Sequence, residues 1–417
     1  MVDRLAAPAR LARRAARLFR YWRSERRTLR QGIAALALST CAGFVAGLVL
    51  GSITGTLDDL PGFLVLIPAA VGMRGNIMGA IAARLGTGVV TGLFEPTLRR
   101  GSVLADNVEV GLLSAVLTSL YLAAIAKPVA AAFGEHTVSF WDLVTISVVG
   151  GVLASVVILV LTIALAVLSF RRGWDLDAVG TPIITALGDM VTLPALFVAS
   201  LIARHEAATT ATALGCLLVG AIALLRVAGW SPATVRRILL EMAGVLALAP
   251  LLDILAGALL EAQRPRLEHV AGLLILIPPF VSQAGALGGI LSSRLSSKLQ
   301  LGVITPRGRP EIPALVDGSI VVLLGVTIFT VIGAVAWGLA VATGQPHPTG
   351  GTMVGGSLLA GLLVLPVTLV CGYYLAVLTS RFGLDPDNHG VPIITSVMDL
   401  AGVAAILLVM RTSGVLG

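Results

Sequence analysis

The stretch GFLVLIPAAVGMRGNIMGAIAARL, residues 62–85, has a related copy in GLLILIPPFVSQAGALGGILSSRL, residues 272–295. Ten of the 24 aligned positions are identical, among them a proline, three glycines and an arginine. Residues 171–190 and 381–400 align at the same offset of 210, with ten identities in 20 positions. Apolar composition can align one leucine with another, but it does not place Pro, Gly, Arg and Asp at one constant offset. The chain therefore contains an internal duplication.

The composition is that of a membrane protein. Of the 417 residues, 57% are apolar and only 12% are charged, whereas soluble chains contain about 25% charged residues. The loops are too short to hold a folded nucleotide-binding domain, so we do not expect the chain to use ATP. Eleven segments reach the length of about 20 mainly apolar residues that crosses a bilayer; they are 31–53, 63–85, 103–126, 143–169, 180–203, 208–229, 236–260, 270–292, 314–342, 352–380 and 390–411.

The number of segments sets the relation between the two repeats. Each repeat has five segments and ends on the side opposite its start, and one linking segment then returns the chain. Both repeats therefore enter the membrane in the same orientation, related by a pseudo-two-fold axis along the membrane normal. We expect an all-α polytopic membrane protein in which one chain is sufficient to form a pore on that axis. The parts are a basic segment (1–30), a first repeat (31–205), a linking helix (206–230) and a second repeat (231–417).

Basic residues predict the orientation. The first 30 residues contain ten arginines interleaved with Leu, Phe and Trp, which is typical of an amphipathic helix on an anionic lipid surface. With this segment in the cytoplasm, the inner loops hold thirteen basic residues and the outer segments five. Cytoplasmic loops of membrane proteins carry such an excess. We therefore expect a plasma (inner) membrane protein with a cytoplasmic N-terminus and an outer C-terminus, bound to lipid and not to nucleic acid.

Two aspartates are the strongest candidates for function. Asp189 and Asp399 lie at equivalent positions midway along apolar segments, each seven residues after a matched proline. Ionisable residues at such depth are costly and usually functional. One turn earlier, Thr185 and Thr395 share their helix faces, and Thr181 extends the first face. Carboxylate and hydroxyl oxygens suit Mg²⁺ or Ca²⁺ better than thiophilic metals. The alternative is that each aspartate only bonds to a neighbouring helix.

The segment from Pro68 to Asn76 places proline and glycines at membrane depth. Such a pattern predicts a broken helix, which a membrane tolerates only where the backbone is buried in protein or lines a wet cavity. We expect freed carbonyls at Gly75 and its counterpart Gly285 to face an ion, with the amide oxygen of Asn76 beside them. Close helix packing through small residues is the alternative.

Other charges give weaker signals. Arg74 is expected to neutralise an acid or to cap carbonyl groups. Asp253 aligns with Gly43 and so lacks a symmetric partner; one arrangement left open is an ion pair with Arg74. Four aspartates at the predicted cytoplasmic ends of two segments either attract cations or cap helices; they are Asp175, Asp177, Asp385 and Asp387.

Together these motifs resemble the membrane domain of the MgtE magnesium channels and the related solute carrier family 41 magnesium transporters. The residues that carry the resemblance are Pro68-x3-Gly72-x2-Gly75-Asn76 and the Pro-x2-Thr-x3-Asp runs at 182–189 and 392–399. In MgtE, two five-helix domains form a homodimer, and a pore aspartate from each subunit holds a largely hydrated Mg²⁺. The resemblance implies that Asp189 and Asp399 are the pore aspartates of this chain.

The chain also departs from that pattern. Its 417 residues contain no counterpart of the cytoplasmic domains that sense Mg²⁺ in MgtE, so we do not expect that regulation. The second repeat lacks the Gly-Asn pair of positions 75 and 76, which predicts a lopsided ion site.

The functional expectation is a divalent cation transporter, not an enzyme, with Mg²⁺ as the transported ion. Movement down the membrane potential and coupling to Na⁺ or H⁺ are both open. The alternatives are a transporter of Co²⁺, Mn²⁺ or Zn²⁺, a proton-coupled carrier of small solutes, and a non-transporting membrane scaffold.

Overall fold

A computed structural model describes residues 26–53, 60–134, 137–172, 176–203, 206–384 and 389–416. Within these ranges all regular structure is helical, as lipid requires of an open chain whose backbone groups must bond internally. The basic segment expected on the membrane surface lies almost wholly outside the described residues.

The helices repeat at the offset found in the sequence. The first repeat comprises α2 (Arg26–Ser52), α4 (Phe63–Val90), α5 (Val103–Ala132), α6 (Phe140–Thr145), the π-helical turn η1 (Ile146–Gly150), α7 (Gly151–Arg172) and α8 (Leu176–Ile202). The second comprises α10 (Ala233–Glu261), the short α11 (Arg264–His269), α12 (Gly272–Gln300), α13 (Ile312–Thr343), α14 (Gly350–Phe382) and α15 (Val391–Thr412). Between them lie α9 (Glu206–Leu225) and the π-helical turn η2 (Arg226–Trp230).

Nine helical segments among the described residues are long and apolar enough to cross a membrane. The other two expected spans correspond to α2 and α8, whose qualifying apolar stretches are shorter, Leu36–Ser52 and Ala186–Ile202. The chain is thus an all-helical polytopic membrane protein, as expected.

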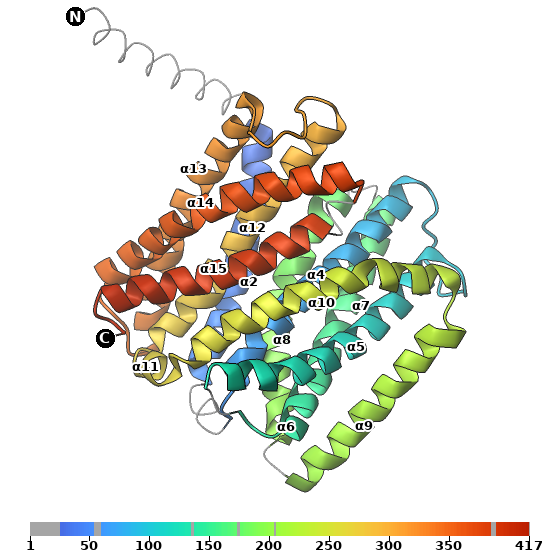
Figure 1. Ribbon diagram of the computed structural model, residues 1–417, viewed down its shortest axis with the longest axis horizontal. Coiled ribbons are helices and arrows are strands. Elements are labelled where there is room, and N and C mark those ends of the chain that lie inside the picture. Colours follow the sequence, from blue (N-terminus) through green and yellow to red (C-terminus); the bar gives the residue numbers. More distant parts are fainter. Residues whose placement is uncertain are drawn as a thin grey trace, which may run out of the picture.

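The two repeats pack on each other through their first and second helices. The first helix of each repeat packs along the second helix of the other, α2 on α12 and α10 on α4. The last helices complete the centre, because α8 packs on α4 and α2 while α15 packs on α12 and α10. These six helices surround the middle of the bundle (Figure 1). Side chains on the inner faces of these helices can therefore reach the opposite repeat.

Glycines permit the closest of these contacts. A Cβ atom at Gly47 of α2 would lie 2.4 Å from the carbonyl oxygen of Ile275 in α12. A Cβ atom at Gly257 of α10 would lie 2.4 Å from the carbonyl oxygen of Val65 in α4. Both pairs are related by the offset of 210, so the sequence duplication is also a symmetry of the packing.

The expected break in α4 and α12 is wrong. Both are continuous α-helices that include Pro68, Pro278 and Pro279. A proline inside a helix removes one hydrogen bond, and packing against neighbouring helices can offset that loss. The carbonyls of Gly75 and Gly285 therefore belong to regular helix, which supports the small-residue packing alternative.

The linking helix α9 lies along one edge of the bundle (Figure 1), where it contacts α5 and α6. Its outward side chains are large and apolar, and they are exposed; they include Leu214, Leu218, Ile222 and Leu225. In a membrane protein such a surface faces lipid.

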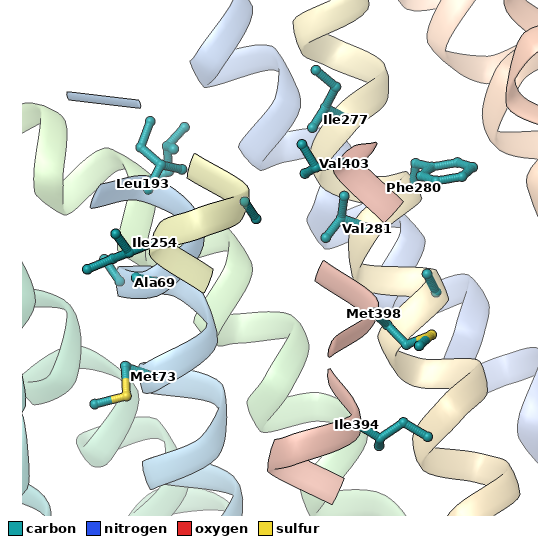
Figure 2. Close-up of a cluster of buried hydrophobic side chains, with 14 of the residues drawn as sticks. Ala69, Met73, Leu193, Ile254, Ile277, Phe280, Val281, Ile394, Met398 and Val403 are labelled. Carbon is teal, nitrogen blue, oxygen red and sulfur yellow. The ribbon is translucent and has the colours of Figure 1, made fainter. Parts of the chain in front are cut away.

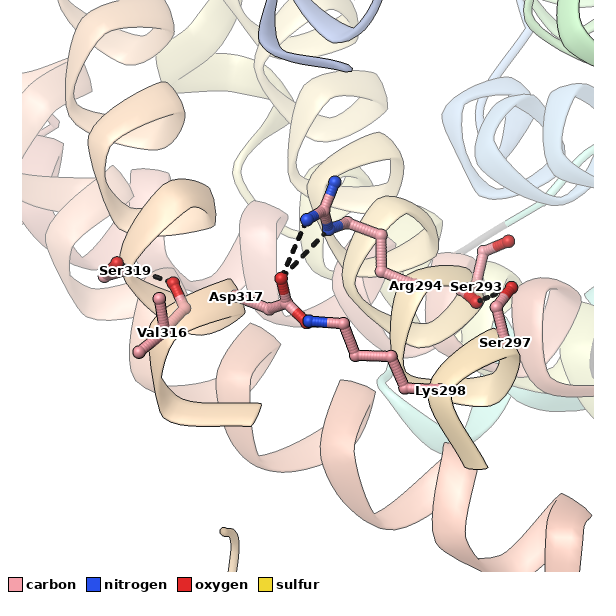
Figure 3. Close-up of polar contacts among 7 residues, drawn as sticks. All are labelled: Ser293, Arg294, Ser297, Lys298, Val316, Asp317 and Ser319. Atoms are coloured by element: carbon pink, nitrogen blue, oxygen red, sulfur yellow. Dashed lines mark hydrogen bonds and ion pairs between the residues drawn. The ribbon is translucent and has the colours of Figure 1, made fainter. Parts of the chain in front are cut away.

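A charged cluster joins α12 to α13 in the second repeat (Figure 3). Nη2 of Arg294 lies 2.8 Å and Nζ of Lys298 lies 2.5 Å from separate oxygens of Asp317, whose side chain is fully buried. In the first repeat, the positions equivalent to Lys298 and Asp317 are Gly88 and Asn107. This cluster therefore belongs to one half of the protein only.

Replacing Asp317 with Asn is expected to lower the free energy of unfolding by about 2 kcal/mol, less than the cost of breaking a fully buried pair because both cations reach solvent. Thermal unfolding of the purified protein in detergent measures the change. The matched control is Glu241→Gln, which breaks an exposed pair with Arg237 and should change stability by less than about 1 kcal/mol. Equal shifts for both variants would contradict the prediction.

Candidate cation site

Asp189 lies at the centre of the bundle and reaches the opposite repeat. Its carboxylate is on α8 and is buried, with 7% of the residue exposed. Oδ2 accepts a 2.7 Å hydrogen bond from Oγ of Ser282 on α12. Oγ of Ser282 in turn lies 3.1 Å from Oγ of Ser39 on α2. Asp189 therefore belongs to a polar chain that crosses the interface between the repeats.

Asp399 on α15 takes the corresponding place in the other half. A Cβ atom at Gly72 of α4 would lie 3.5 Å from Oδ2 of Asp399. Gly72 and Ser282 are equivalent positions at the offset of 210. Each aspartate thus points at the same position on the second helix of the other repeat. The two carboxylates also lie close enough to interact electrostatically, so they face one central region.

A third carboxylate enters this region from α10. Oδ2 of Asp253 would lie 2.8 Å from a Cβ atom at Gly72, and the residue is fully buried. Its neighbours are Asp399 and Ser396 of α15. Sequence reasoning gave Asp253 little weight because its aligned residue is Gly43. One feature of the sequence could have pointed to Asp253. Gly72 stands where the other repeat has Ser282, and a glycine leaves space for a neighbouring side chain.

The pairing of Asp253 with Arg74 is wrong. Arg74 is fully buried, and its guanidinium donates to the carbonyl oxygen of Ala70 at 3.1 Å and to Oγ of Ser119 at 2.6 Å. Gly151 provides space for it, because a Cβ atom there would collide with Nη2. Arg74 therefore caps a carbonyl within the first repeat, which was the other expected role.

Two of the remaining candidates have described side chains and two do not. The hydroxyl of Thr395 donates to the carbonyl oxygen of Pro392 in its own helix at 2.9 Å. Asn76 is partly buried, and its Nδ2 has no hydrogen-bond partner among the described residues. The side chains of Thr181 and Thr185 are not among those described.

The four aspartates expected at the cytoplasmic helix entrances cannot be placed either. Their side chains lie outside the described residues; they are Asp175, Asp177, Asp385 and Asp387.

Gly75 and Gly285 serve close helix packing. A Cβ atom at Gly188 of α8 would lie 3.6 Å from the backbone nitrogen of Gly75. A Cβ atom at Gly285 would lie 3.4 Å from Cγ2 of Thr395 on α15. The two glycines therefore bring α8 and α15 against the second helix of their own repeats, which fixes the depth of the aspartates.

Buried apolar side chains pack between the helices that carry the carboxylates. Figure 2 shows Ala69 of α4 beside Ile254 of α10, and Val281 of α12 beside Val403 of α15. All four are buried. In such surroundings the interactions of a charge are stronger than in water.

The charges of these acids are not balanced by a basic side chain of the described residues. Across the described part of the chain, Asp189, Asp253 and Asp399 form no ion pair with Lys or Arg. Within the same residues, no three His, Cys, Asp or Glu side chains are arranged to hold a metal ion directly.

The profile of the MgtE family, described as a divalent cation transporter, matches residues 67–199 and again residues 277–409. The chain belongs to the MgtE family. The two matches are displaced by 210 residues, so both repeats are MgtE domains. The family is one of transporters, and the protein is accordingly a membrane transporter and not an enzyme.

Curated relatives of this MgtE-family protein span most of its length. Solute carrier family 41 member 3 of Rattus norvegicus is 26% identical over 396 residues, which cover 89% of this chain and 84% of the relative. The Mus musculus member 3 is 27% identical over 371 residues, covering 84% and 75%. Member 2 of Xenopus laevis is 25% identical over 396 residues, covering 89% and 69%. No solved structure matches the chain significantly.

Proposed function

We propose that this MgtE-family protein carries Mg²⁺ across the membrane between its two repeats, and that Asp189 and Asp399 contact the ion. One observation carries the proposal: the buried Asp189 and the half-buried Asp399 point at equivalent positions of the opposite repeat, Ser282 and Gly72. A cation that enters the repeat interface would therefore meet a carboxylate from each half. Neither acid pairs with Lys or Arg among the described residues, and an acid in this situation is better stabilised by a cation than by lipid.

The chemistry of Mg²⁺ favours recognition through its water shell. The ion prefers octahedral oxygen ligands and gives up water reluctantly, and two carboxylates cannot replace six waters. In our proposal Asp189 and Asp399 supply charge, while Ser39, Ser282 and Thr395 bond to the waters of the ion. Asn76, Thr181 and Thr185 are further candidates for this role. Binding must stay weak enough to release the ion on the other side.

The proposed topology has eleven spans, with α2 and α8 crossing as the first and fifth. The repeat units are residues 31–205 and 231–417, joined by 206–230, and the N-terminus lies in the cytoplasm. The orientation rests on the distribution of Lys and Arg between inner and outer loops. A single chain supplies both aspartates, so the pore needs no second subunit.

The test is ion flux into liposomes that contain the purified protein and a dye for divalent cations. We expect Mg²⁺ to enter and to compete with Co²⁺, Mn²⁺ and Zn²⁺ when all are present at equal concentration. Flux of Co²⁺, Mn²⁺ or Zn²⁺ without flux of Mg²⁺ would replace the proposed substrate. The absence of any divalent flux would overturn the proposal and would favour a solute carrier or a scaffold. Imposed Na⁺ and pH gradients in the same liposomes separate a channel from a coupled transporter.

A further inference from the structure

We infer that Asp253 is a third cation-binding carboxylate, placed on the α15 side of the site, so that the two halves of the site hold the ion unequally. This inference rests on the proposed function, because it assigns a further residue to the same site. Asp253 lies outside both family-matched regions, 67–199 and 277–409. Its role must therefore be argued from the contacts of this chain.

The carboxylate of Asp253 lies beside that of Asp399, at a position that only one half of the protein provides. Asp253 and Asp399 both lie against Gly72, with Oδ2 atoms 2.8 and 3.5 Å from a Cβ atom built on that glycine. The equivalent half has Ser282 in place of Gly72 and Gly43 in place of Asp253. Gly43 has no room for an acid, because its Cβ atom would lie 2.6 Å from Cα of Pro279. One half is therefore built for two carboxylates and the other for one carboxylate and a hydroxyl.

Asp253 is fully buried, yet among the described residues neither of its oxygens accepts a hydrogen bond of normal distance and angle. Ser396 and Asp399 of α15 are its polar neighbours. Arg74 is engaged with Ala70 and Ser119. A buried carboxylate without a donor is costly, whereas a bound cation or its waters would satisfy both oxygens.

The negative charges at the site also favour a cation. Asp399 interacts with both Asp253 and Asp189, and like charges at short range repel strongly in a low-dielectric site. A divalent cation near Asp253 and Asp399 relieves that repulsion. On the other side, Asp189 already accepts a hydrogen bond from Ser282, so a bound cation adds less stabilisation to its charge. The ion should therefore bind nearer to Asp399.

The experiment compares the Mg²⁺ concentration that gives half-maximal flux in three variants. Asp253→Asn removes the charge and is expected to raise this concentration about 10-fold, which corresponds to about 1.4 kcal/mol. Gly72→Ala keeps the charge but places a methyl group 2.8 Å from Oδ2 of Asp253, so it should displace the carboxylate and act in the same direction. Glu241→Gln on the same helix changes an exposed carboxylate and should leave the concentration unchanged.

The outcomes separate this inference from the proposed function. If wild-type protein carries no divalent ion, or if Asp189→Asn with Asp399→Asn leaves flux intact, the proposed function fails. If wild-type protein carries a divalent ion and the Asp189→Asn, Asp399→Asn double variant loses flux, but Asp253→Asn and Gly72→Ala leave the half-saturating concentration unchanged, only the inference fails. A purely structural role for Asp253 would lower thermal stability in detergent without moving that concentration. Should Asp253→Asn not yield folded protein, the half-saturating Mg²⁺ concentration of Gly72→Ala tests the inference in its place.

Discussion

Replacing Asp189 and Asp399 together with Asn is expected to reduce Mg²⁺ flux about 100-fold, while the protein still folds. Asn keeps the size of each side chain and removes both charges. Losing the partner of a buried charge costs about 3 kcal/mol, which is about 100-fold in binding. Stopped-flow influx into dye-loaded liposomes, normalised to the amount of folded protein, measures the effect. Flux equal to that of wild type would remove these aspartates from the ion path.

The single variants Asp189→Asn and Asp399→Asn test the contribution of each aspartate separately. Asp399 has Asp253 beside it, whereas Asp189 accepts a hydrogen bond from Ser282. We expect Asp189→Asn and Asp399→Asn to differ in their effect, because each leaves a different set of oxygens. The exposed Glu241 is the control residue, and Glu241→Gln should carry Mg²⁺ at the wild-type rate.

The second large effect is expected at the packing between repeats. Gly257→Ala places a methyl carbon 2.4 Å from the carbonyl oxygen of Val65, a backbone atom that cannot rotate away. Helices α10 and α4 must then separate, and overpacking of this kind costs up to about 3 kcal/mol. We expect a lower unfolding midpoint in detergent and loss of flux, since the aspartates would no longer lie against the second helix of the opposite repeat. Gly47→Ala should do the same at the symmetric contact with Ile275.

Gly244→Ala is the matched control for Gly257→Ala. Both glycines lie on α10, but a Cβ atom at Gly244 has no atom within 4 Å. The substitution should leave the unfolding midpoint and the flux near their wild-type values. If Gly244→Ala is as damaging as Gly257→Ala, the effect comes from the helix backbone and not from the interface between repeats.

Sequence reasoning found the paired aspartates because their signal is local and repeated. An acid in an apolar segment is unusual by itself, and a second one at an offset of 210 is hard to attribute to chance. Asp253 gave no such signal, since its counterpart is Gly43. Only the structure brings Gly72, Asp253 and Asp399 together, because that contact depends on how α10 is rotated against α4.

The predicted break in α4 and the predicted partner of Arg74 also fail because they depend on tertiary contacts. Pro68 and the glycines after it predicted a broken helix, but neighbouring helices hold α4 continuous. Arg74 was a possible partner for Asp253 on the grounds of charge alone. In the structure Gly151 opens a space for Arg74 beside Ser119, and no property of residues near Arg74 in the sequence predicts that space.

The membrane location, the duplication and the matched position of Asp189 and Asp399 can be predicted from the amino-acid sequence alone. These follow from composition and from a constant offset, which need no knowledge of contacts. The tertiary structure decided which helix faces meet: α2 against α12, α10 against α4, and Asp253 beside Asp399. The physical reason is that these helices are apolar on most of their surface, so the pattern of residues does not specify which face turns inward. Small residues and shape complementarity between the two repeats determine which helix faces meet.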